Sequence, residues 1–189
     1  MKRAIVFTLT AFLTTVTYAA QPSIGFSKAA TYDVVSQEKI SAGDYDYIFS
    51  CVTSRAVGKE ERAHTMVKAI MDIQSASPPG IKIALHLAPD RSLCQEGRLI
   101  GVSYYSPDGS GWKRVGRGSW TWNISTTGKK VTEQEISDTV LYEKSKPEFK
   151  KKFGDLYYSE KLDEYVKSQL GHEPKYVTTG LWVDTYHVE

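Results

Sequence analysis

Cysteine is scarce in this chain of 189 residues, which contains only Cys51 and Cys94. No C-x-x-C motif is present, so a thioredoxin-like redox role is disfavoured. In an oxidising compartment, two cysteines are most simply joined to each other. The alternative is a reactive thiol, which needs a neighbouring base and a reason to stay reduced, and the sequence indicates neither. We therefore predict one disulfide between Cys51 and Cys94.

Long apolar runs are also lacking, apart from one at the N-terminus. Residues 1–19 open with Lys2 and Arg3, continue with an uncharged and largely apolar run over 4–16, and end with small residues. This order is typical of a secretory signal peptide that is cleaved after residue 19. The run is shorter than the roughly 20 residues of a membrane-spanning helix, although a retained anchor is the alternative. We expect an exported protein, periplasmic or secreted, without a transmembrane segment after leader removal.

Net charge is lacking once the leader is set aside. The whole chain has 24 lysine and arginine residues against 22 aspartate and glutamate residues. Two of the basic residues lie in the leader, so the mature chain is expected to carry equal numbers of both signs. Proteins that bind nucleic acid usually carry an excess of positive charge. Global charge therefore argues against nucleic acid as a partner.

Motifs for catalysis and metal binding are missing as well. The four histidines show no H-x-x-x-H pair, and the chain has neither a G-x-S-x-G motif nor a phosphate-binding glycine loop. We therefore predict no metal, no cofactor and no catalytic residue. An enzyme whose catalytic groups meet only in the fold stays open as the alternative.

What the sequence does contain is an α+β pattern. Residues 31–40 and 44–54 predict two strands joined by a short turn as a hairpin. Apolar residues at helical spacing predict a helix within 58–77, which ends at a Pro-Pro-Gly turn. Residues 81–88 alternate as a half-buried strand, and 98–105 predict another. This order predicts one amphipathic helix packed on an antiparallel or mixed sheet.

The composition shifts after residue 126. Thr132 and Glu135 form a capping box ahead of a helix of about ten residues. A second helix is predicted over 159–170, with Gly171 as its stop, and the tail reads as a closing strand. We divide the chain into a signal peptide (1–19), a flexible lead-in (20–30), an α+β core domain (31–126) and a C-terminal helical extension with a final strand (127–189).

Five stretches carry a resemblance to a known family: YDVVSQEKIS, YDYIFSCVTS, KEERAHTMVKAIMDI, LAPD and YYSPDGSGW, in that order. Together they resemble a family of small bacterial exported domains of unknown function, over roughly residues 31–112. The resemblance implies a hairpin, a helix, and further strands that end in a Pro/Gly–Trp turn. It implies no activity, cofactor or catalytic residue, and the C-terminal third lies outside it.

The stretch GSGWKRVGRGSWTWNIST, residues 109–126, has three tryptophans and three cations but no acidic residue. Trp120, Trp122 and Ile124 alternate along a strand, so we expect them to share one face and to be buried. Trp112 lies instead in a glycine-rich turn, where it is either an exposed stacking platform or folded back on the sheet. The first reading defines a candidate site for a glycan, a peptide or a polyanion, made of Trp112, Lys113, Arg114 and Arg117.

Taken together, these features predict an exported, non-catalytic binding or interaction module of the bacterial cell envelope. Its partner is expected to be an envelope protein or polymer, and its oligomeric state is left open. Two alternatives are an envelope hydrolase with a site assembled only in the fold, and a polyanion- or glycan-binding protein.

Overall fold

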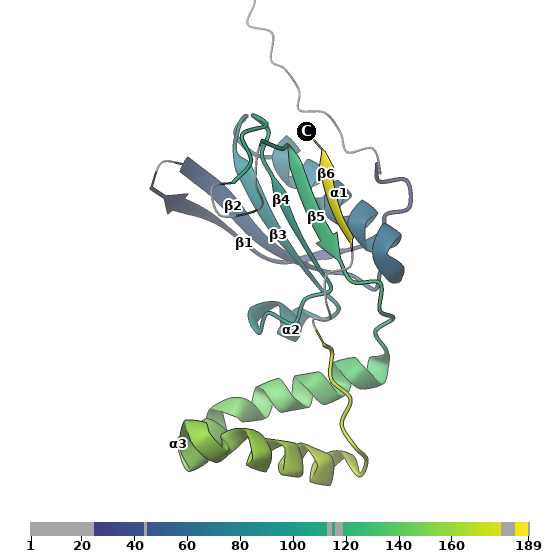
Figure 1. Cartoon of the computed structure of the whole chain (residues 1–189), viewed down its shortest axis with the longest axis vertical. Helices are drawn as coiled ribbons and strands as arrows, with labels where there is room; N and C mark the ends of the chain where they lie inside the picture. The colour runs from purple at the N-terminus through teal and green to yellow at the C-terminus, as the bar shows by residue number, and fades with distance from the viewer. Residues whose placement is uncertain (1–24, 44, 113–114, 116–118, 179–183, 189) are drawn as a thin grey trace, which may run out of the picture.

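A computed structural model of the chain describes residues 25–43, 45–112, 115, 119–178 and 184–188. These residues form a mixed six-stranded sheet in the order β1-β2-β3-β4-β5-β6, with helix α1 against one face and a helical arm beyond one end (Figure 1). The predicted α+β class is confirmed. The predicted signal peptide lies outside the described residues.

The first two strands form the predicted antiparallel hairpin, and α1 then crosses over so that β3 pairs with β2 in parallel. All other neighbouring strands are antiparallel. The strands are β1 (Asp33–Ala42), β2 (Tyr45–Thr53), β3 (Lys82–Ala88), β4 (Gly101–Tyr105), β5 (Trp122–Thr126) and β6 (Asp184–Val188).

Helix α1 (Gly58–Ser75) buries the apolar stripe predicted from its sequence. Met66, Val67 and Ile70 lie in one core cluster with the alternating apolar residues of β3, including Leu85 and Leu87. Because strand side chains alternate, this packing leaves the other residues of β3 on the opposite face of the sheet. That opposite face carries the candidate site.

The end of the lead-in is attached to the outer side of α1. The backbone N–H of Lys28 donates to Nδ1 of His64 at 3.0 Å, and that of Ala30 donates to Oγ1 of Thr65 at 3.0 Å. These contacts explain why two polar side chains of α1, those of His64 and Thr65, are buried.

The arm consists of α3 (Glu133–Leu170), whose two halves run side by side in opposite directions (Figure 1). The predicted capping box and the Gly171 stop are both confirmed. The predicted length of about ten residues was too short, because the first half continues through Pro147 and bends only at Gly154. Gly154 takes a φ of 70°, a conformation that glycine adopts without steric cost.

The disulfide between Cys51 and Cys94 is present and ties β2 to the short helix α2 (Arg91–Gln95). Around it lies a second apolar cluster that includes Leu93, Leu99 and Ile136, and so joins the end of the sheet to the arm. The predicted closing strand is confirmed as β6, which pairs with β5. Within the described residues, no helix combines the length and apolarity that crossing a bilayer requires.

Candidate functional site

Trp112 is folded back on the sheet, as the second reading of the sequence allowed. Its side chain is only 9% exposed and packs between Tyr47 and Tyr104, at ring-centroid distances of 5.0 and 5.3 Å. Its indole N–H donates to the carbonyl of Tyr105 at 3.2 Å. Trp112 is therefore not an exposed platform, because its ring packs against two tyrosines of the sheet and its N–H donates to a backbone carbonyl.

The three cations of the predicted site, Lys113, Arg114 and Arg117, lie outside the described residues. Their role in binding stays a prediction.

Trp120 and Trp122 are both buried, as predicted. The expectation that they share a face is wrong. Trp122 belongs to the cluster under α1, whereas Trp120 joins Trp112 and Ala84 on the opposite face. The alternation fails because β5 begins only at Trp122, and Trp120 precedes it in an irregular segment.

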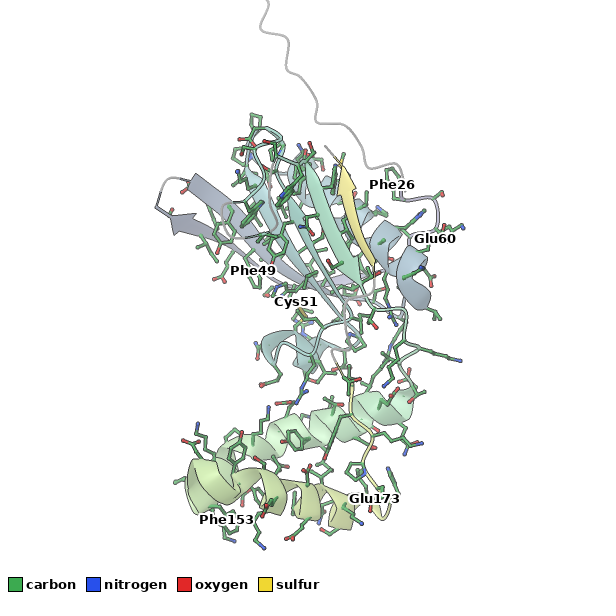
Figure 2. The ribbon with its side chains drawn as sticks, viewed as in Figure 1. Phe26, Phe49, Cys51, Glu60, Phe153 and Glu173 are labelled. Carbon is green, nitrogen blue, oxygen red and sulfur yellow. A yellow bond between two sulfur atoms is a disulfide. The ribbon has the colours of Figure 1, made fainter. Side chains whose placement is uncertain are left out.

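The face of the sheet opposite α1 carries four half-buried aromatic side chains from three adjacent strands. Tyr47 and Phe49 come from β2, His86 from β3 and Tyr104 from β4. The His86 ring meets that of Phe49 edge-on, with centroids 4.8 Å apart. Figure 2 shows Phe49 over the strands, while Glu60 lies away from it on α1. We call these four residues the aromatic face.

Tyr47 and Phe49 are two positions apart in the sequence, so a strand places both on one side, but this spacing does not show that the side stays partly open. The small Ala84 at the centre of β3 leaves room for the rings of Trp112 and Trp120. These rings cover only part of the face. The apolar cluster around the disulfide, which includes Ile136 of the arm, covers the sheet end near Cys51. The remaining aromatic surface is thus set by contacts distant in sequence.

The aromatic face is uncharged at neutral pH. Burial holds the pKa of the His86 imidazole below its ordinary value of 6.5. Burial also raises the pKa of Tyr104, with a further contribution from the neighbouring Tyr47. The ammonium of Lys82 lies beside this face and donates to Oγ of Ser110 at 2.8 Å and to the carbonyl of Gly111 at 2.6 Å. Because the four rings are neutral and the ammonium of Lys82 is hydrogen-bonded within the protein, the aromatic face suits an uncharged or apolar ligand surface.

The low pKa of His86 predicts a pH dependence of stability. As pH falls below 6.5, the unfolded chain binds a proton at this position before the folded chain does, so the stability of the folded state falls. His86→Phe keeps a ring against Phe49 and removes this titration. We expect the wild type to lose more stability than His86→Phe between pH 7.5 and 5, measured by thermal unfolding. Parallel curves would contradict the assignment.

The side chains of two other histidines, His64 and His172, are engaged elsewhere. Nδ1 of His64 accepts the backbone N–H of Lys28, and Nε2 of His172 lies 3.2 Å from a carboxylate oxygen of Asp138 on the arm. Across the part of the chain that the structure describes, no group of three or more His, Cys, Asp or Glu residues is placed to hold a metal ion.

The fold defines an α+β domain with a helical arm and a partly open aromatic sheet face. A family model for a domain of unknown function (DUF4875) matches residues 27–183, and the chain belongs to that family. The match extends through the C-terminal third, beyond the region of the resemblance noted in the sequence.

Among solved structures, a DUF487 family protein from Desulfovibrio piger is similar, with a TM-score of 0.60 and 15% sequence identity. The similarity covers 85% of this chain and 95% of that one. At this identity it concerns the fold alone. A comparison with curated proteins finds no match.

Proposed function

We propose that the chain is an exported, non-catalytic binding module of the bacterial cell envelope, which binds a protein or an envelope polymer through the aromatic face. The observation that carries this proposal is the set of aromatic rings left half-exposed on a sheet whose other face is covered by α1. A contiguous aromatic surface of this kind is typical of interaction sites.

Two further observations support the compartment. The N-terminal residues have the order of a secretory leader, and a disulfide such as Cys51–Cys94 is stable where the environment is oxidising. The structurally similar protein also comes from a bacterium.

The chemistry of the face favours a ligand that offers apolar or sugar-ring surface. Tyrosine and phenylalanine rings bury large areas at little entropic cost. Because the four rings are neutral at pH 7, contacts with them should respond weakly to salt, although Glu38 and Lys82 are the cross-strand partners of Phe49 and Tyr47. A polyanion held by the Lys113, Arg114 and Arg117 turn would instead be released steeply as salt rises.

The test is affinity capture from envelope extract with the mature protein, residues 20–189, at low and moderate salt. Phe49→Ser removes a ring from the aromatic face, and we expect it to weaken binding at least about tenfold. Phe26→Ser is the matched control, because Phe26 is 43% exposed and lies on the α1 side (Figure 2). Thermal unfolding of both variants is the check that each of them is folded.

A ligand that survives moderate salt and is lost only in Phe49→Ser supports the proposal. A ligand retained only at low salt and lost when Lys113, Arg114 and Arg117 are neutralised would make the basic turn the site instead. Turnover of a captured substrate that depends on one serine or histidine would contradict the non-catalytic module and support the alternative of an envelope hydrolase.

A further inference from the structure

A groove lies at the end of the sheet that faces the arm, separate from the aromatic face. Three adjoining depressions open there, and Arg55 lines all of them. The largest has a volume of about 650 Å³ and lies between α2 and the first half of α3.

The position of the groove follows from the parallel pairing of β2 and β3. Parallel neighbours end at the same edge of a sheet, and ligands of α/β proteins commonly bind at that edge. Here each strand is followed within three residues by an arginine: Arg55 after β2, and Arg91 after β3. Both side chains are exposed and line the same depression.

A third cation, Lys144, reaches the groove from α3. Asp90 lies on the wall of the same depression. Burial would raise the pKa of this carboxyl, but the hydrogen bonds from Ser92 and, with smaller contributions, the charges of Arg55 and Lys144 hold it below its ordinary value.

Arg55 already holds a carboxylate, that of Glu133, with 2.9 Å between Nη1 and Oε1. The two side chains are 57% and 80% exposed, and an ion pair this exposed to water is weak. Within the described residues, Arg91 and Lys144 have no ion pair. Glu133 is thus an easily displaced occupant of a position where a ligand carboxylate would fit.

The lining of the largest depression combines positive charge with apolar side chains. Three cations and two carboxylates, Asp90 and Glu133, line it, so its wall carries one net positive charge while Glu133 is in place. An apolar group with one carboxylate can use both parts of this lining, whereas inorganic phosphate has no apolar part. Beside the cations lie Val35, Ile136 and Val140, which extend the apolar cluster around the disulfide.

We propose that this groove binds an apolar group that carries a single carboxylate, with Arg55 and Arg91 holding the carboxylate and the valine and isoleucine side chains holding the apolar part. Such a group is either the C-terminus of a peptide with an apolar last residue or a small aliphatic carboxylate. Ligand binding displaces Glu133 from Arg55.

The experiment is calorimetric titration of the purified protein with its disulfide intact. The probes are an acetylated tripeptide ending in leucine, the same tripeptide as its C-terminal amide, hexanoate and inorganic phosphate. We expect binding of the free carboxylate that weakens at least tenfold on amidation, and no comparable binding of phosphate. Tighter binding of the tripeptide assigns the peptide source, and tighter binding of hexanoate assigns the small carboxylate.

Three variants locate the site. Arg55→Gln combined with Arg91→Gln should weaken binding at least tenfold, because it removes both guanidinium groups. Glu133→Gln should strengthen binding several-fold, because it removes the internal competitor. Lys161→Gln, an exposed cation elsewhere on the arm, should bind as the wild type does.

Equal binding of the amide, equal binding of phosphate, or full binding by the double arginine variant would each overturn the proposal. So would failure of every carboxylate to bind. None of these results depends on the aromatic face, whose own test uses Phe49→Ser.

Discussion

Replacing Cys51 and Cys94 together by alanine is expected to lower the free energy of unfolding by about 4 kcal/mol. The two cysteines are 43 residues apart in sequence, so the disulfide removes much of the freedom of the unfolded chain. In the folded state it also ties α2 to β2, within the apolar cluster that supports the arm. Denaturation in urea, followed by circular dichroism, measures the loss.

The control for this prediction is chemical. Reduction of the wild type should reproduce the loss seen in the double alanine variant, and the same reductant should leave the variant unchanged. A loss below about 1 kcal/mol would mean that the unfolded chain retains contacts that make the cross-link redundant.

The Arg62→Met substitution is expected to cost about 3 kcal/mol. Arg62 on α1 is buried, and its guanidinium donates to three backbone carbonyls, those of Ala56, Thr127 and Lys129. Methionine fills a similar space but donates nothing, so buried acceptors lose their partners. Since two of the carbonyls lie in the link between β5 and α3, the loss should loosen the start of the arm.

Two measurements separate this effect from a general loss of stability. Hydrogen exchange over residues 127–136 should accelerate in Arg62→Met under conditions where the strands stay protected. The matched control is Arg91→Gln, whose exposed side chain should change stability by no more than about 0.5 kcal/mol. Unchanged exchange in the link would contradict the role given to Arg62.

Apart from the disulfide, the predictions that were confirmed concern residues close together in sequence. The hairpin of β1 and β2, the stripe of α1 and the capping box of Thr132 and Glu135 each depend on side chains a few positions apart. Hydrophobic periodicity and capping chemistry indicate such elements directly. The length of α3 was missed, because the helix that begins at the capping box continues through Pro147 and bends only at Gly154.

The candidate site was harder to predict because it depends on how distant segments meet. The sequence left open whether Trp112 is exposed or folded back on the sheet, since its neighbours in sequence are glycines and cations, and the rings of Tyr47 and Tyr104 decide this by packing against it. The two-residue spacing of Trp120 and Trp122 predicts a shared face on a strand, but the two side chains lie on opposite faces of the sheet. The one available signal was the aromatic alternation of Tyr47 and Phe49 along β2.

By itself, the sequence determined the α+β class, the hairpin, the boundaries of α1 and the pairing of the only two cysteines, because local spacing and simple counting decide these. Only the tertiary structure decided which aromatic residues stay half-exposed, since that depends on where Trp112 and Trp120 pack against the sheet. The tertiary structure also brought Arg55 and Arg91 to one groove. Parallel pairing of β2 and β3, which α1 connects, places the ends of the two strands together. No local sequence pattern indicates that Arg55 and Arg91 lie close together in space.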